Sequence, residues 1–118
     1  MPSDFAGRKF NDHTITDPSW QNAPPLVRIA ASQQGGTRGA QLWGIDQNEA
    51  LWSTFQETPG GPWSAWDGPN WLGATSLVQI TAAQQNNGCV QLWGIDTNLA
   101  VKTTAQTSPG GDWTGWSP

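Results

Sequence analysis

The 118-residue sequence predicts an all-β protein built from two copies of one unit. The first observation is a repeat, because residues 41–46, Gln-Leu-Trp-Gly-Ile-Asp, return unchanged as residues 91–96. The second is a series of short apolar runs separated by Gly, Pro, Asp and Asn turns at a spacing of roughly 8–12 residues, which is typical of strands. The third is that no segment has helical periodicity over a useful length. A repeat of about 50 residues indicates a fold of stacked, similar units.

The repeat covers most of the chain and divides it. The segment 59–61, Pro-Gly-Gly, matches 109–111, and further upstream Leu26 and Val27 match Leu77 and Val78. We therefore expect one unit at residues 17–66, a second at 67–118, and a leader at residues 1–16 outside both. Residues 13–16 of the leader contain β-branched side chains, which favour a strand that could cover an exposed sheet edge. A disordered leader is the equal alternative.

Each unit is expected to form four short strands. In the first unit these lie at residues 26–32, 40–45 and 50–56, with an outermost strand that begins at 63–66. Turns at residues 35–36, 46–48 and 59–61 separate them, since Gly, Pro, Asp and Asn favour turn backbones. The run at 26–32 is nearly continuously apolar, which predicts a strand that is buried on both faces.

A four-stranded sheet that repeats every 40–50 residues or so is typical of a propeller blade, so we expect a β-propeller with two blades per chain. Blades bury their faces against each other, and about three or more are needed for stability. Two blades leave apolar faces in water, which favours head-to-tail association into a closed ring. We expect three chains and six blades; four chains and eight blades are the alternative.

Composition excludes several classes of partner. Charged residues make up 12% of the chain and the net charge is −4, so no basic surface for nucleic acid is expected. No apolar run is long enough for membrane insertion. Cys89 is the single cysteine, so no internal disulfide can form. No secretion signal is visible in residues 1–10, which predicts a cytoplasmic protein or export by a route without a visible signal.

The residues for catalysis or metal binding are scarce, and we expect no enzyme activity, no metal and no cofactor. His13 is the single histidine and lies in the leader. Asp46 and Asp96 are followed by turn residues and are interpreted as turn caps. Paired carboxylates for glycoside cleavage would have to use Glu49 and Glu57, which have no counterparts in the second unit.

The repeat also resembles a known family. Residues 41–46, then Leu51-Trp52, Gln56, 59–61, Trp63-Ser64 and Trp66, are similar to the blade signature of tectonin-like propeller lectins, especially their PVL-like and PLL-like fungal and bacterial branch. The resemblance covers both units. It implies a β-propeller that binds sugars, with fucose, O-methylated sugars or N-acetylglucosamine as the ligand class. This chain departs from that pattern in having two blades and in replacing Trp52 by Lys102 and Phe55 by Ala105 in the second unit.

Aromatic plates and neutral amides suit a sugar site, because sugars present an apolar C–H face together with hydroxyl groups. Trp43 and Trp93 are interpreted as core, and Trp20 and Trp71 as core or blade interface. The predicted ligand-binding residues combine rim tryptophans, one tryptophan that is specific to the first unit, and amides: Trp52, Gln56, Trp63, Trp66, Gln41, Gln91, Gln106, Trp113 and Trp116. The pairs Gln33-Gln34 and Gln84-Gln85 are expected near the ligand, and any role of Arg38 is confined to the first unit.

Together these features predict a non-catalytic lectin that binds glycans through several weak sites around a ring, since multivalency raises affinity. The alternative is a structural or protein-interaction propeller, natural, engineered or fragmentary, with no sugar site.

Overall fold

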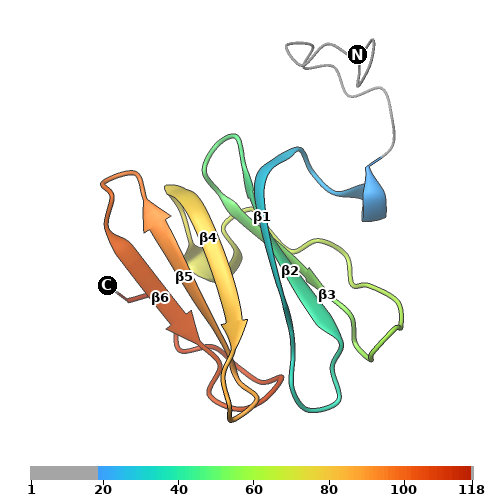
Figure 1. Ribbon diagram of the computed structural model, residues 1–118. Helices are drawn as coiled ribbons and strands as arrows, with labels where there is room; N and C mark the ends of the chain where they lie inside the picture. Colours follow the sequence, from blue (N-terminus) through green and yellow to red (C-terminus); the bar gives the residue numbers. More distant parts are fainter. Residues whose placement is uncertain (1–18, 118) are drawn as a thin grey trace, which may run out of the picture.

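Two antiparallel sheets of three strands form the computed structural model, which describes residues 19–117 (Figure 1). The first sheet contains, in this order, β1 (Leu26–Gln33), β2 (Ala40–Asp46) and β3 (Leu51–Phe55). The second contains β4 (Leu77–Gln84), β5 (Val90–Asp96) and β6 (Val101–Ala105). Two three-residue 3₁₀ helices, η1 (Trp20–Asn22) and η2 (Trp71–Gly73), precede β1 and β4. The all-β prediction is confirmed, whereas His13 and the expected strand at 13–16 lie outside the described residues.

The two repeat units fold alike. Trp43 pairs with Ser53 across β2 and β3, and the equivalent Trp93 pairs with Thr103 across β5 and β6. Both first strands also have an irregularity near their start, between Leu26 and Arg28 and between Leu77 and Gln79. The sequence repeat is therefore a repeat of strand register.

The predicted turn caps are confirmed. Asp46 Oδ1 accepts hydrogen bonds from the backbone N–H groups of Asn48 (2.8 Å) and Ala50 (3.0 Å), and Asp96 does the same for Asn98 and Ala100. Such side-chain bonds hold a tight turn without help from elsewhere in the chain.

The prediction of four regular strands per unit is wrong for the outermost one. The third strands are followed by segments that pair with them only at isolated positions: Gln56–Trp63, Ser53–Asp67, Gln106–Trp113 and Thr103–Ser117. The cause is a side chain in the ladder. Ser64 Oγ accepts the N–H of Phe55, and Thr114 Oγ1 accepts the N–H of Ala105, so a hydroxyl group takes a place that a strand would give to a backbone carbonyl. We call residues 63–67 and 113–117 the bridged segments.

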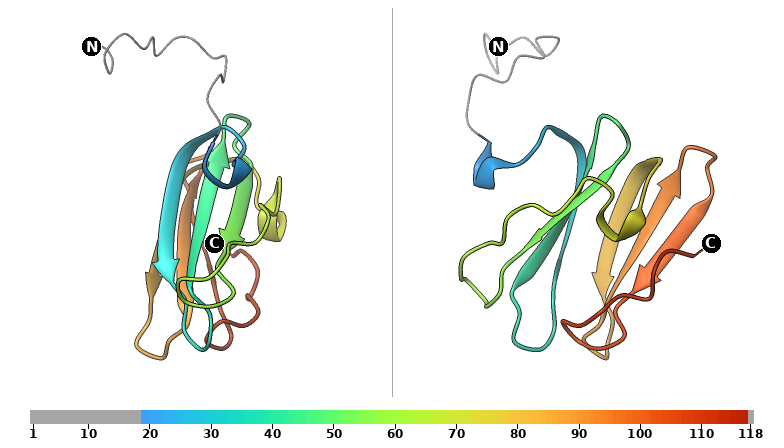
Figure 2. Two further views of the ribbon diagram at one scale, coloured as in Figure 1. Left: turned by 90° about the vertical axis from the view of Figure 1, so that its right-hand side faces the viewer. Right: turned by 180° about the vertical axis from the view of Figure 1, so that it is seen from behind.

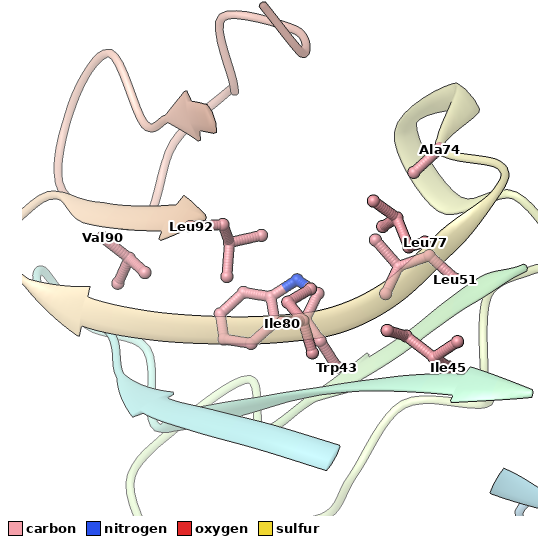
Figure 3. Packing of buried hydrophobic residues seen from close by; sticks show 8 residues of the cluster. All are labelled: Trp43, Ile45, Leu51, Ala74, Leu77, Ile80, Val90 and Leu92. Carbon is pink, nitrogen blue, oxygen red and sulfur yellow. The ribbon is translucent and has the colours of Figure 1, made fainter. Parts of the chain in front are cut away.

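The core lies between the two sheets. The first sheet contributes Trp43, Ile45 and Leu51, and the second unit contributes Ala74, Leu77, Ile80, Val90 and Leu92 (Figure 3). β1 and β4 are neighbours at the middle of the molecule, and β3 and β6 lie toward opposite sides (Figure 1). The interpretation of Trp43 as a core residue is confirmed, since its side chain is fully buried.

The prediction that residues 26–32 are buried on both faces is wrong. Most of β1 is exposed or half-buried, and Val27 and Ile29 are among the most exposed apolar side chains of the described chain. The reason is that each sheet has a neighbouring sheet on one face within residues 19–117. The view from behind shows the two sheets next to each other, joined by the link from β3 to β4, which contains η2 (Figure 2, right).

Candidate functional site

A cavity of about 520 Å³ lies between the two units, and we call it the inter-sheet cavity. The first unit supplies most of its wall, η2 supplies a second part, and the loop before the last bridged segment closes it. Its lining residues are Gln34, Arg38, Gln41, Ser53, Phe55, Ser64, Ala65, Asp67, Trp71, Leu72, Gly110, Gly111 and Trp113. This volume is in the range of small-molecule sites.

Rigid aromatic rings form one wall of the inter-sheet cavity. The rings of Trp71 and Trp113 meet edge-to-face with centroids 5.3 Å apart, and both contact the buried ring of Trp43, at 6.2 Å and 5.8 Å. Such edge-to-face contacts are a favoured aromatic geometry. Trp71 and Trp113 are therefore held in place by the core while they remain partly exposed to the cavity.

Glycines bring the loops that border this cavity close together. A Cβ atom on Gly35 would lie 2.5 Å from the carbonyl oxygen of Gly88 and 2.9 Å from Cβ of Pro109. A Cβ atom on Gly110 would lie 3.1 Å from the carbonyl oxygen of Gly35. Larger residues at these positions would force the two units apart, so the loop glycines set the width of the junction.

A chain of hydrogen bonds fixes the amide of Gln34. The Val90 N–H donates to Gln106 Oε1 (2.8 Å), and Gln106 Nε2 then donates to Gln34 Oε1 (2.7 Å). The backbone N–H of Val90 fixes the oxygen of the Gln106 amide, so the nitrogen of that amide faces Gln34. The oxygen of the Gln34 amide accepts from this nitrogen, and the Nε2 group of Gln34 points away from Gln106. Within residues 19–117 the Nε2 of Gln34 has no hydrogen-bond partner. Gln34 therefore offers a donor at the wall of the inter-sheet cavity.

The amide of Gln41 is fixed in the opposite sense. Gln41 Nε2 donates to Ser53 Oγ (2.8 Å), and Ser53 Oγ donates to the carbonyl oxygen of Leu42 (2.9 Å). Among the described residues, Gln41 Oε1 has no donor. The same wall therefore carries one amide donor, from Gln34, and one amide acceptor, from Gln41.

The charged groups of the cavity do not form a pair suited to hydrolysis. Asp67 is the one carboxylate among the described lining residues, and glycoside hydrolysis ordinarily uses two. The Arg38 guanidinium lies over the Phe55 ring, 4.5 Å from its centroid, as a cation–π contact. Between residues 19 and 117 there is no group of three His, Cys, Asp or Glu side chains placed to hold a metal ion. The helices of that same span are too short to cross a bilayer.

A second cavity, of about 430 Å³, lies on the face of the first sheet that points away from the second sheet. Its lining residues are Gln21, Asn22, Pro24, Trp52, Trp63, Ser64, Ala65 and Trp66. Trp52 is held there by a hydrogen bond from its Nε1 to Asp46 Oδ2 (2.8 Å). This cavity is walled by the first unit alone.

The predicted site residues thus fall into three groups. Gln41 and Trp113 line the inter-sheet cavity, together with Gln34, which we expected near a ligand, and Arg38. Trp52, Trp63 and Trp66 line the second cavity. Gln56, Gln91, Gln106 and Trp116 line neither cavity.

Two of the amides outside both cavities, Gln56 and Gln91, are bound within their own units. Gln56 Oε1 accepts the N–H of Ala40 (3.1 Å) and its Nε2 donates to the carbonyl of Gly61 (3.0 Å). Gln91 Nε2 donates to Thr103 Oγ1 (2.9 Å). Trp116 packs against the core.

Sequence reasoning missed Ser53, Ser64 and Asp67 as lining residues. A signal for Ser53 was present, since strand alternation places it on the same face as Leu51 and Phe55, opposite Trp52. Ser64 and Asp67 gave no such signal, because their segment pairs with β3 only at isolated positions.

Comparison with protein-family models and with curated proteins found no match to this sequence. The resemblance to tectonin-like lectins therefore stays a prediction.

Proposed function

We propose that this protein is a non-catalytic lectin that binds a neutral saccharide in the inter-sheet cavity. One observation carries the proposal: the cavity combines the rings of Trp71 and Trp113 with an available amide donor on Gln34 and an available amide acceptor on Gln41. A sugar hydroxyl both donates and accepts hydrogen bonds, and the C–H face of a sugar ring packs on an aromatic surface. The cavity offers both kinds of contact on neighbouring walls.

The binding is expected to be weak for a single site. By analogy with base stacking, one aromatic plate contributes about 1–3 kcal/mol. Hydrogen bonds to neutral groups add about 0.5–1.5 kcal/mol each. Affinity in a biological setting would then come from several sites that act together.

The fold is proposed to be a β-propeller in which each sheet, with its bridged segment, is one blade. Three paired strands plus a partly paired fourth, repeated with the same register, support this proposal. Together with the resemblance to tectonin-like lectins, it makes fucose, O-methylated sugars and N-acetylglucosamine the first ligands to test.

The direct experiment is a glycan array with the labelled 118-residue chain. We expect signal on one coherent class of neutral glycans, and loss of that signal when the matching free monosaccharide is added. A blank array with folded protein would contradict the lectin proposal and favour a propeller without a sugar site.

Two neighbouring glutamines provide a matched pair of variants. Gln34 lines the inter-sheet cavity and offers the amide donor, whereas Gln33 is exposed and lines neither cavity. Gln34→Ala is expected to weaken array binding at least about tenfold, which corresponds to roughly 1.4 kcal/mol. Gln33→Ala is expected to bind as the parent chain does. Equal binding by both variants, with unchanged melting temperatures, would place the ligand elsewhere.

A further inference from the structure

Residues that are equivalent in the two units differ sharply in burial, and which unit holds the buried residue depends on the face of the sheet. On the face of the first sheet that meets the second sheet, Leu51 is 0% exposed. Its equivalent Val101 is 57% exposed. Trp43 and Ile45 of this face are also buried, while their equivalents Trp93 and Ile95 are half-buried. We call Trp93, Ile95 and Val101 the outer face of the second sheet.

The opposite side of the contact shows the reverse difference. Ile80 of the second sheet is 3% exposed, whereas its equivalent Ile29 is 62% exposed. Leu77 and Leu92 are buried, whereas their equivalents Leu26 and Leu42 are half-buried. We call Leu26, Ile29 and Leu42, with Trp20 and Trp63 beside them, the outer face of the first sheet. The chain therefore carries, on its two outer sides, surfaces that are equivalent to the two that it joins in its own core.

The tryptophans make this equivalence specific. Trp71 and Trp113 meet edge-to-face at 5.3 Å and 84°, and Trp43 completes the cluster from the other sheet. Their equivalents Trp20 and Trp63 meet edge-to-face at 5.0 Å and 79°. Trp20 is nevertheless 54% exposed. The residue equivalent to Trp43 is Trp93, and it lies on the outer face of the second sheet. The Trp20–Trp63 pair thus has the same edge-to-face arrangement as the Trp71–Trp113 pair, against which Trp43 packs.

We propose that the outer face of the second sheet binds the outer face of the first sheet in a second copy of this chain. Trp93 of one copy then packs on Trp20 and Trp63 of the next, as Trp43 packs on Trp71 and Trp113. A backbone contact follows from the same equivalence. The Leu77 N–H donates to the carbonyl of Glu49 (3.0 Å) across the existing junction, so the Leu26 N–H donates to the carbonyl of Leu99 across the new one.

The contact joins two different surfaces, so it is head-to-tail and not two-fold symmetric. Each copy keeps one face free for the next until a ring closes. None of the residues that define the two outer faces is charged. The inter-sheet cavity lies within one chain, so this interface does not depend on the proposed sugar site.

The test uses two variants that each damage one face: Ile29→Glu on the first sheet and Val101→Glu on the second. Both side chains are largely exposed in the single chain, so both variants are expected to keep its fold, as circular dichroism and thermal melting will check. In sedimentation velocity at micromolar concentration, the parent chain is expected to associate and each variant alone to be monomeric. An equal mixture of the two is expected to form dimers and nothing larger, because one intact face of each kind remains between them.

Leu99→Glu is the matched control. Leu99 is 81% exposed and is the most exposed large apolar side chain of residues 19–117. Its equivalent at the existing junction is already an acidic residue, Glu49. The proposed contact therefore tolerates this change, and association is expected to stay as in the parent chain. Association through general stickiness would instead be weakened by it.

Three results would overturn the proposal. The first is a parent chain that is monomeric at micromolar concentration. The second is self-association of Ile29→Glu alone, which would mean that the outer face of the second sheet binds itself. The third is a mixture of the two folded variants that forms no dimer. A failure of the proposed association is distinguished from a failure of the proposed sugar site by glycan binding of the Ile29→Glu variant. This variant keeps the inter-sheet cavity intact, so it is expected to bind glycans even as a monomer.

Discussion

The carboxylates of Asp46 and Asp96 are single residues on which a turn in each unit depends. Burial raises the pKa of Asp46, but hydrogen bonds from Trp52 Nε1 and from the Ala50 and Asn48 N–H groups together outweigh it, so its pKa lies below the usual 3.8. The Ala100 N–H is the largest influence on Asp96 and lowers its pKa; burial opposes this, while the Asn98 N–H and the nearby Lys102 ammonium add to the lowering. Both carboxyl groups are therefore more easily ionised in the folded chain than in the unfolded one.

This sign sets the pH dependence of stability. A group whose pKa is lowered by folding contributes stability above its unfolded pKa, and that contribution is lost as pH falls below about 3.8 through the folded value. Asp46→Asn is expected to lower the urea midpoint at pH 7, because its amide N–H₂ cannot accept from Trp52. It should also flatten the fall in stability between about pH 4 and pH 2.5. Asp112→Asn, at an exposed position, is the control; an identical acid profile for Asp46→Asn and the parent chain would contradict the assigned role.

For single residues, the sequence predicted the role correctly where a side chain contacts residues close to it in the chain. Asp46 caps a turn two to four residues ahead, and such a contact follows from the local sequence. It failed to separate Gln34 from Gln33, because their difference arises from Gln106, 72 residues away along the chain. Residues that act through the junction of the two units are visible only once the units are placed together.

For the secondary-structure elements, the sequence predicted the first three strands of each unit well but not the segments that follow the third strands. Apolar runs and turn residues located β1, β2 and β3 to within a residue or two of their ends. The hydroxyl groups of Ser64 and Thr114 interrupt the fourth pairing, and a polar residue in an expected strand gives little warning of this. Trp52, Trp63 and Trp66 were predicted to bind a ligand, and the structure gathers them in one cavity away from the junction.

The junction between the loops at residues 35–38 and 109–111 is the element that shapes the inter-sheet cavity. Gly35→Ala would place its Cβ 2.5 Å from the Gly88 carbonyl oxygen, a contact that requires the backbone to move. We expect a loss of about 1–3 kcal/mol in the free energy of unfolding, together with weaker glycan binding. Thr37→Ala, at an exposed position of the same loop, should leave both unchanged. A Gly35→Ala chain with the stability of the parent would show that the loops are not close-packed.

The whole molecule is organised by the contact between its two units. The same contact builds the core, holds Trp71 and Trp113 at the cavity, and leaves two complementary outer faces on the chain. The repeat in the sequence predicted two similar sheets and apolar faces between them. It also predicted that two blades leave apolar faces in water. It did not predict which residues form those faces, because equivalent residues such as Ile29 and Ile80 are identical in type and differ only in their neighbours.

The proposed lectin activity belongs to this scale as well, since neither unit contains the whole inter-sheet cavity. The first unit supplies Gln34, Gln41 and Ser53, and the two aromatic rings come from Trp71 and Trp113 of the second. A ligand in this cavity therefore contacts both units. A ligand in the second cavity contacts the first unit alone.

The most direct measurement of the central claim is an NMR titration of the tryptophan indole N–H signals. The 118-residue chain, labelled with nitrogen-15 and assigned with single Trp→Phe variants, is titrated with fucose, an O-methylated hexose and N-acetylglucosamine in turn. The account predicts that one of these sugars shifts the signals of Trp71 and Trp113 and leaves those of Trp52 and Trp66 in place. Shifts confined to Trp52 and Trp66 would move the site to the second cavity, and no shift with any of the three at millimolar concentration would contradict saccharide binding in the inter-sheet cavity.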